Sequence, residues 1–306
     1  MNVGYDAKLY LLPFDHRHSY ESGMFKYAEP LTPEQHSKIA DSKRLIYEGF
    51  RRSIELGVPA ACAGILVDEE FGADILRDAR RRRYITAVST EKSGSNEFDF
   101  QYGDQFERHI EDFDPTFVKA LVRYNPDDDD ALNRRQSVRL RTLSDYCRSC
   151  GRYFMFELLV PATAAQTSSV NGDADRYDAD VRPELVVRTI EALQDSGVEP
   201  DVWKIEGFGR AEDCERVVRA ARRAGRSRVG CIVLGRGADE QKVINWLTTA
   251  ASVAGFVGFA VGRTTFWDAV AAYEAGRSTR EQAAEAVAKR YTEWVSIFEA
   301  AARTLR

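Results

Sequence analysis

The chain has 306 residues, of which 44% are hydrophobic and 30% are charged. This length suits one α/β domain, and its 16 Phe and 13 Tyr provide a core large enough to exclude global disorder. The formal net charge of −5 argues against a nucleic-acid-binding protein, and no apolar run approaches the ~18 residues of a membrane-spanning helix.

The N-terminal segment and the cysteines point to the cytoplasm. Residues 1–20 lack a basic start, a long apolar segment and a small-residue cleavage site, so we expect no signal peptide. Five cysteines form an odd number spread over a long chain, which suits a reducing compartment. Cys147 and Cys150 form a C-x-x-C pair, but no second pair or nearby histidine completes a zinc site. We therefore expect a cytoplasmic protein without a metal or another cofactor.

Short apolar runs alternate with amphipathic stretches along the chain. The predicted strands are residues 9–14, 63–68, 84–89, 117–124, 153–160, 201–207, 229–235 and 255–262. Helical patterns separate many of them, and the clearest cover 33–57, 132–150, 183–198, 211–225, 239–255 and 279–304. Strands alternating with helices indicate βαβ units and a parallel sheet. Eight such units predict an α/β fold, a single (β/α)8 TIM barrel over residues 1–306, with the active site at the C-terminal ends of the strands. A doubly wound sheet is the competing fold, but FDHRHS follows the first strand in place of a glycine-rich fingerprint.

Two polar segments depart from this regular pattern. Residues 91–104 and 161–182 are rich in turn residues, and each follows a predicted strand. In a barrel, such loops lie at the C-terminal face, so we expect both to help build the site. The acidic run Asp127–Asp130 is interpreted as the start of a helix, where carboxylates face the positive end of the helix dipole.

Nearly every predicted strand contains a charged residue or is followed by one. In chain order these are Asp15, His16 and Arg17; Asp68, Glu69 and Glu70; Glu91 and Lys92; Lys119 and Arg123; Glu157; Lys204 and Glu206; Arg236 after Gly235; and Arg263 after Gly262. Because loops after barrel strands carry active sites, these residues are the candidate functional set.

Lys204 is the residue of this set that points most clearly to a chemical role. The chain has 34 Arg and only nine Lys, and this lysine lies between Trp203 and Ile205 in an apolar strand. Burial beside a second cation lowers the pKa of a lysine and suits its amine to Schiff-base chemistry, and Lys119 could be that cation. Alternatively, Lys204 forms a structural ion pair with Glu157 or Glu206.

The other strand residues also have two interpretations. The Lys119 ammonium either lines the site or pairs with Asp68 or Glu91. Glu157, within an apolar strand, needs a partner and is a candidate proton shuttle. Asp15 either bonds a substrate hydroxyl or caps the following turn.

The two Gly-Arg pairs form a second constellation. Gly235-Arg236 and Gly262-Arg263 follow the seventh and eighth predicted strands, and a helix begins soon after each pair. Barrel enzymes frequently bind phosphate in these two loops, through backbone N–H groups and a cation. The alternative is that both arginines form salt bridges on the rim.

The four histidines do not form a metal set. Only His16 and His18 lie near the expected mouth of the barrel, whereas a catalytic metal centre would need about three converging ligands.

These residues occur in motifs that resemble a known family. The succession PFDHRHS, DEEFG, EKSGSNEFDFQYGD, VKALVRYNPDD, FMFELLVPAT, EPDVWKIEGF, CIVLGRGAD and GFAVGRTTFWD resembles the 2-deoxy-5-keto-gluconate 6-phosphate aldolase domain of inositol catabolism. It is more distantly similar to the class I tagatose-bisphosphate and sulfofructose-phosphate aldolases. The resemblance covers roughly residues 8–300, and we expect a stand-alone version without the kinase domain that often precedes this module. The chain departs from the family at His18, where glycine is usual, and in the long segment 161–182; both could alter substrate preference.

The resemblance implies a role for each matching residue. Lys204 of the D-V-W-K-I-E motif would be the Schiff-base nucleophile, and Glu157 of F-E-L-L-V-P the general acid/base. Lys119 and Asp15 would bind polar groups of the substrate. Gly235, Arg236, Gly262 and Arg263 would hold the phosphate. Arg17, Lys92 or Arg123 could supply an extra cation for a substrate carboxylate.

The resulting hypothesis is a class I, metal-independent aldolase. Lys204 would attack the ketone of a phosphorylated keto-sugar or keto-sugar acid, and Glu157 would take the hydroxyl proton of the departing fragment. The family implies cleavage of 2-deoxy-5-keto-gluconate 6-phosphate to dihydroxyacetone phosphate and malonic semialdehyde. The alternatives are a tagatose-bisphosphate or sulfofructose-phosphate aldolase, and a non-catalytic sugar-phosphate sensor. The expected partner is a small sugar phosphate, with no nucleic acid and no membrane, and we expect a homo-oligomer.

Overall fold

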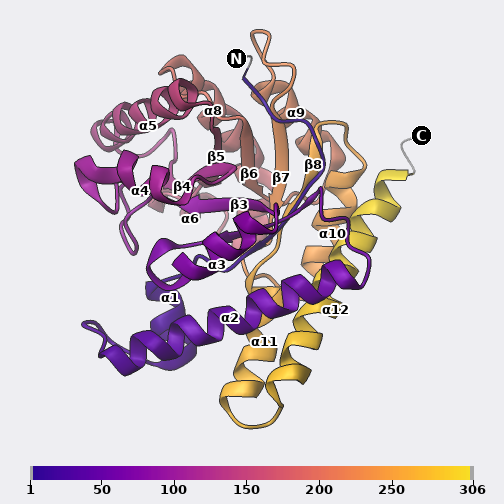
Figure 1. Cartoon of the computed structure of the whole chain (residues 1–306). Helices are drawn as coiled ribbons and strands as arrows, with labels where there is room; N and C mark the ends of the chain where they lie inside the picture. The colour runs from indigo at the N-terminus through magenta and orange to yellow at the C-terminus, as the bar shows by residue number, and fades with distance from the viewer. Residues whose placement is uncertain (1–2, 304–306) are drawn as a thin grey trace.

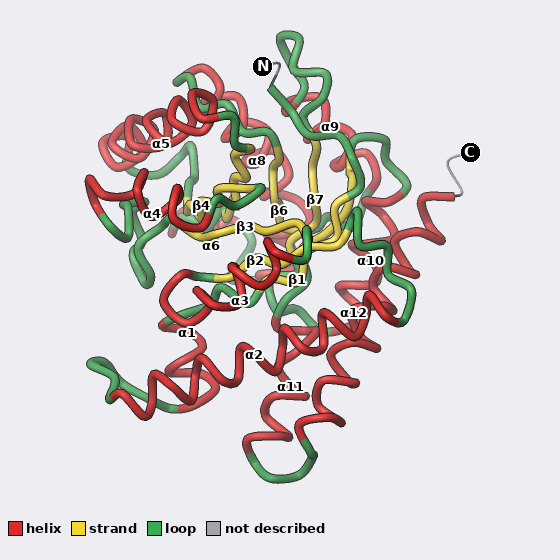
Figure 2. The backbone as a smooth tube through the Cα atoms, viewed as in Figure 1, coloured by secondary structure: helices red, strands yellow, loops and turns green. Residues whose placement is uncertain are grey.

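The computed structural model describes residues 3–303 as eight parallel strands closed into a barrel, in the order β1 to β8. The strands are β1 (Leu9–Pro13), β2 (Ala63–Val67), β3 (Ile85–Ser89), β4 (Phe117–Arg123), β5 (Tyr153–Leu159), β6 (Val202–Glu206), β7 (Gly230–Leu234) and β8 (Phe256–Ala260). Each strand lies inside its predicted range and is shorter than that range by one to three residues, so the (β/α)8 barrel predicted from the sequence is confirmed. Figure 2 shows the strands at the centre of the molecule with helices around them.

Helices follow the strands and cover the outside of the barrel (Figure 1). The α-helices are α1 (His18–Tyr20), α2 (Pro33–Glu55), α3 (Glu69–Arg81), α4 (Phe106–Phe113), α5 (Asp130–Cys150), α6 (Ala164–Ser169), α7 (Ala174–Arg176), α8 (Arg182–Asp195), α9 (Ala211–Ala221), α10 (Glu240–Ala251), α11 (Arg263–Glu274) and α12 (Arg280–Ala302). Shorter π-helical turns occupy Glu21–Phe25 and Tyr177–Val181, and a 3-10 turn occupies Gly103–Gln105. None of the described helices is long and apolar enough to cross a membrane.

The sequence signals for helix starts work as expected. Thr32 and Gln35 form a reciprocal capping box at the start of α2, with Pro33 in its first turn. In the acidic run, Asp129 accepts hydrogen bonds from the N–H groups of Ala131 and Leu132, which confirms it as the start of α5.

The barrel has two apolar layers. Alternate strand residues point outward against the helices, and the others fill the barrel. The inner layer consists of Leu9, Leu11, Leu66, Ala87, Phe117, Met155, Val202, Ile232 and Ala260. Tyr5 packs edge-on against Phe117 and Tyr153 at the amino-terminal end of the strands, with ring centroids 5.0 and 5.2 Å away. At the opposite end of the barrel, where the strands have their carboxyl ends, polar side chains take the place of the inner apolar layer.

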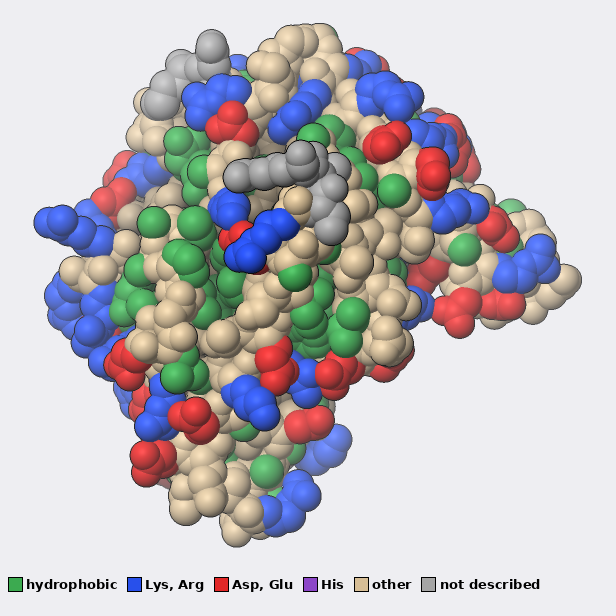
Figure 3. All heavy atoms as spheres, turned by 90° about the vertical axis from the view of Figure 1, so that its right-hand side faces the viewer, with side chains coloured by type: hydrophobic (Ala, Val, Ile, Leu, Met, Phe, Trp, Pro, Cys, Tyr) green, Lys and Arg blue, Asp and Glu red, His purple; other side chains and the backbone are tan. Residues whose placement is uncertain are grey.

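Ion pairs join the outer elements of the fold. Arg280 on α12 pairs with Glu48 on α2 at 2.9 Å, and Lys8 pairs with Glu299 on α12 at 2.6 Å. On the face in Figure 3, basic and acidic side chains are interspersed, with hydrophobic side chains between them.

The segment 161–182, expected to be irregular, is largely helical. It contains α6, α7 and the π-helical turn Tyr177–Val181. Thr163 and Gln166 form a capping box at the start of α6, and Asp173 caps α7 through the N–H groups of Asp175 and Arg176. These local caps stabilise helices too short to show an apolar period, which is why the sequence pattern missed them.

Candidate active site

A cavity of about 400 Å³ opens at the carboxyl ends of the strands. All of the predicted site residues line it except Gly235, which lies between the lining residues Leu234 and Arg236. The segment Glu91–Phe98 forms part of its wall, as expected for the first polar loop. No residue of the segment 161–182 lines the cavity, but Asp178 of this segment pairs with the lining residue Arg236, so the second polar loop contributes to the site only indirectly.

The period of two in a strand places the charged residues of β4, β5 and β6 in one layer. Lys119, Glu157 and Lys204 each follow an inner-layer residue by two positions, so they face the interior one step closer to the mouth. Glu157 and Lys204 are direct partners in the pairing of β5 with β6. The register of the barrel therefore sets this contact between residues 47 positions apart in the chain.

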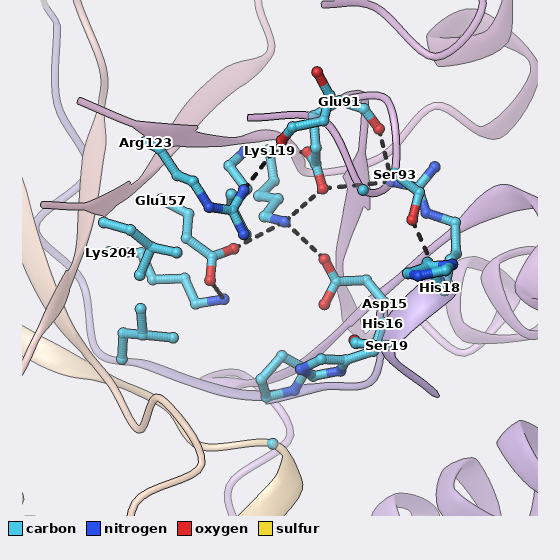
Figure 4. Close-up of a pocket in the computed structure, with 18 of the residues that line it drawn as sticks. Asp15, His16, His18, Ser19, Glu91, Ser93, Lys119, Arg123, Glu157 and Lys204 are labelled. Carbon is cyan, nitrogen blue, oxygen red and sulfur yellow. Dashed lines mark hydrogen bonds and ion pairs between the residues drawn. The ribbon is translucent and has the colours of Figure 1, made fainter. Parts of the chain in front are cut away.

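Lys119 is buried at the centre of three carboxylates. Its ammonium lies 2.7 Å from Asp15 Oδ2, 2.8 Å from Glu91 Oε1 and 2.8 Å from Glu157 Oε2 (Figure 4). Burial opposes its charge, but attraction to Asp15, Glu157 and Glu91 outweighs burial and raises the pKa of Lys119. Its contacts with Asp15 and Glu91 are hydrogen bonds and its contact with Glu157 is an ion pair, so Lys119 is a fixed cation at neutral pH.

Lys204 has a different environment. Its amine lies 2.8 Å from Glu157 Oε1, and among the described residues this is its one carboxylate partner. Glu157 therefore bridges the two buried lysines, one at each oxygen. Burial opposes the charge of this carboxyl, but Lys119 and Lys204 together lower the pKa of Glu157 below its usual value. Of the two ion-pair partners considered for Lys204, the structure shows Glu157 and not Glu206.

The two arginines expected at the phosphate differ from one another. The Arg236 guanidinium donates to Asp178 at 3.0 and 2.5 Å and to Glu206 at 2.9 Å. Although burial opposes its charge, these carboxylates raise the pKa of Arg236. The backbone of Arg236 is left-handed, with φ of 50°. In the structure, Arg236 is thus engaged in the rim salt bridges that the sequence offered as the alternative.

Arg263, in contrast, has no carboxylate partner among residues 3–303. It is the first residue of α11, and its side chain donates to the carbonyl oxygen of Arg236 at 2.8 Å. The preceding Gly262 allows β8 to approach β1, since a Cβ there would lie 2.3 Å from the carbonyl oxygen of Pro13. Arg263 is therefore a cation available to an anion at the start of a helix.

The three cations expected to meet a substrate carboxylate also differ. Arg17 is buried and donates to the Glu91 carbonyl oxygen at 2.6 Å and to Gln101 Oε1 at 3.2 Å, so it braces the loop. Arg123 donates to the carbonyl oxygen of Ser95 at 3.2 Å. Lys92 is exposed, and within the described chain neither Lys92 nor Arg123 has a carboxylate partner.

Sequence reasoning missed several residues that support the site. Asp68, considered as a partner of Lys119, instead pairs with the buried Lys43 of α2. Lys43 also donates to the carbonyl oxygen of His16 at 2.9 Å, which anchors the loop after β1. Asp178 holds Arg236 from the segment 161–182. Lys43 lies in a long amphipathic helix, where a lysine ordinarily indicates a solvated face, so the pattern gave no signal for it.

One described group of side chains has the composition of a metal site. His18, Glu21 and Glu29 bring potential ligand atoms within 4.8 Å of one another. His18 lines the cavity, but none of the three contacts the Lys119 cluster. Metal chemistry at the two lysines would therefore need other ligands.

The fold is shared with two solved structures of low sequence identity. One is Cgl0159 from Corynebacterium glutamicum (Brevibacterium flavum), with 18% identity, a TM-score of 0.53, and coverage of 95% of this chain and 87% of that chain. The other is the YdjI aldolase from Escherichia coli K12, with 11% identity, a TM-score of 0.55, and coverage of 96% and 92%. No curated protein matches the sequence. A family model described as "Uncharacterized protein conserved in bacteria (DUF2090)" matches residues 4–302, and the chain therefore belongs to the DUF2090 family.

Proposed function

We propose that this chain is a class I aldolase whose Schiff-base residue is Lys204. The observation that carries the proposal is the contrast between two buried lysines at the carboxyl end of the barrel. Lys119 is held by three carboxylates, whereas Lys204 has Glu157 as its one carboxylate partner among the described residues and faces the cavity. A fixed cation beside a second lysine that faces the cavity and contacts a single carboxylate is an arrangement suited to Schiff-base chemistry. The aldolase-like barrel is consistent with it.

The contacts suggest how the first steps proceed. Glu157, 2.8 Å from the Lys204 amine, is placed to take its proton and to return one when the carbinolamine loses water. The resulting iminium withdraws electrons from the carbon–carbon bond being cleaved. Lys119 remains charged through these steps and keeps Asp15, Glu91 and Glu157 in place around the reacting atoms.

The cations of the cavity suggest a substrate with an anionic group at each end. Arg263 follows β8, whereas Arg123 ends β4, and these strands are opposite one another in an eight-stranded barrel. Arg263, at a helix start, suits a phosphate, and Arg123 with Lys92 suits a carboxylate. This pattern fits 2-deoxy-5-keto-gluconate 6-phosphate, the substrate implied by the motif resemblance, with dihydroxyacetone phosphate and malonic semialdehyde as products. A bisphosphate of the tagatose type would place its second phosphate at Arg123.

Turnover by a Lys204→Met variant tests this proposal. The substitution keeps the length of the side chain and removes the nucleophile, so cleavage of the keto-sugar phosphate should fall to the background rate. Lys289→Met, at an exposed position of α12, is the matched control and should retain wild-type cleavage. If Lys204→Met cleaves at a rate near wild type, the Schiff-base mechanism is wrong.

A further inference from the structure

The carboxylates of the site are poorly suited to accept a proton from a substrate hydroxyl. Both oxygens of Glu157 are held by ammonium groups, and Lys119 occupies Oδ2 of Asp15. Burial opposes ionisation of Asp15, but Lys119 and then Lys204 lower its pKa, as they do for Glu157. A carboxylate stabilised in this way by cations is a weak base toward a substrate hydroxyl, whereas Glu157 can still exchange a proton with the Lys204 ammonium that it contacts.

His16, in the loop after β1, differs from these carboxylates because no described residue forms an ion pair with its imidazole, whereas Asp15 and Glu157 are paired with lysines. The Nδ1 atom is buried without a hydrogen bond, and Nε2 forms no hydrogen bond with the described residues. Burial lowers the pKa of His16 to about 4, with smaller contributions from Arg263 and Lys204 that outweigh the opposing effects of Asp15 and Glu157. The imidazole is therefore neutral at neutral pH, with one free lone pair.

The surroundings of His16 hold its ring at the cavity. The ring packs edge-on against Phe266 of α11, with centroids 6.1 Å apart and an angle of 65°. Its backbone carbonyl oxygen accepts a hydrogen bond from Lys43 at 2.9 Å. The backbone of Gly262 lies beside the ring, where a Cβ would be in ordinary van der Waals contact with Cε1 at 3.4 Å. Figure 4 shows His16 beside Asp15 on the cavity wall.

We propose that His16 is the proton-transfer residue of carbon–carbon bond cleavage, taking the place that the sequence assigned to Glu157. This inference rests on the proposed aldolase function. The O–H bond of the departing fragment breaks, and its proton moves to the free imidazole nitrogen. The oxygen electrons form the new C=O bond, the C–C bond breaks, and its electron pair forms the enamine and neutralises the iminium nitrogen. The imidazolium then returns the proton to the enamine carbon, and water hydrolyses the iminium to release the ketone and the Lys204 amine.

The electrostatics of the site favour this sequence of steps. The positive charges of Lys204 and Arg263 disfavour a proton on His16 in the free protein. A bound phosphate at Arg263 offsets one charge, and formation of the neutral enamine removes the other. The proton affinity of His16 therefore rises as the C–C bond breaks and falls again when the iminium re-forms.

Exchange of a substrate proton with solvent tests this role. The full chain is incubated with dihydroxyacetone phosphate in D2O, and NMR follows deuterium entering the hydroxymethyl carbon, which requires the enamine. His16→Asn and His16→Gln should each lower this exchange by about 100-fold, within the range for a general acid–base residue. His36→Asn, on α2 and outside the cavity, is the matched control and should exchange at the wild-type rate.

A second readout separates this role from the proposed function. Both His16 variants should still be trapped on Lys204 by borohydride with dihydroxyacetone phosphate, because iminium formation uses Glu157. Wild-type exchange in the trapped variants would overturn the role of His16 and return it to Glu157 or Asp15. Absence of trapping in the wild-type protein would overturn the aldolase function itself, and the role of His16 with it.

A measurement on the wild-type protein tests the role of His16 without requiring that the variants fold. Isotope-labelled imidazoles of the four histidines report their protonation by NMR. His16 should titrate with a pKa of about 4 in the free protein, and its pKa should rise when dihydroxyacetone phosphate is added. An unchanged pKa in the saturated protein would contradict the coupling of His16 to the reaction.

Discussion

Replacement of Lys119 by methionine removes the cation that holds three buried carboxylates together. Asp15, Glu91 and Glu157 would face one another without their common partner at 2.7 to 2.8 Å. Loss of one partner from a buried ion pair costs about 3–5 kcal/mol of folding free energy. An unfolding entropy of about 2.1 cal/mol/K per residue makes this a decrease of roughly 5–8 °C in Tm for a chain of 306 residues.

The pH dependence of this loss of stability shows whether it arises from the buried carboxylates. In the wild-type protein, the lowered pKa values of Asp15 and Glu157 contribute stability above their ordinary values of 3.8 and 4.5, and this contribution is lost as pH falls through the lowered pKa values. The raised pKa of Lys119 contributes stability below 10.5, which is lost only at higher pH. Without Lys119, the carboxylates repel at neutral pH and gain protons more readily as the pH falls.

Thermal unfolding followed by circular dichroism at pH 7 and pH 5 measures both effects. The Tm difference between Lys119→Met and wild type should be largest at pH 7 and smaller at pH 5. Lys289→Met, on the surface of α12, should leave Tm unchanged at both values. A Tm difference below about 2 °C, or one that is equal at both pH values, would refute the argument that Lys119 neutralises a buried carboxylate cluster.

Three further predictions concern the substrate and the chemistry. Arg263→Gln should lower kcat/KM for the phosphorylated substrate by roughly 10–150-fold, the equivalent of a hydrogen bond to a charged group, and steady-state kinetics with the unphosphorylated sugar as control measures it; equal losses for both sugars would contradict phosphate binding at Arg263. Arg123→Gln should raise KM for a keto-sugar acid more than for the matching keto-sugar without a carboxylate, and equal KM values would place the carboxylate elsewhere. Cleavage should continue at the wild-type rate after dialysis against a chelator, whereas loss of activity that added metal restores would indicate a metal aldolase.

The barrel could be predicted from the sequence because its strands are short apolar runs separated by polar segments. The same alternation explains why Lys119, Glu157 and Lys204 were identified, since a charged residue in an apolar strand is a strong local signal. Their convergence on the cavity follows from the closed barrel, in which all eight strands end at the same face.

What could not be predicted depends on contacts between distant segments. Asp178 reaches Arg236 across 58 positions, and Lys43 meets Asp68 from a separate helix. No local pattern distinguishes Arg236, held by two carboxylates, from Arg263, which has none among the described residues. The missed helix α6 is a different case, because T-x-x-Q at Thr163–Gln166 is a recognisable capping box.

Borohydride trapping tests the central claim most directly. The protein is reduced in the presence of dihydroxyacetone phosphate, and intact mass and peptide mapping locate the product. The proposed mechanism predicts one stable adduct per chain, on Lys204, and none in the Lys204→Met variant. An adduct on another lysine, or no adduct in a preparation that cleaves the keto-sugar phosphate, would contradict Schiff-base catalysis by Lys204.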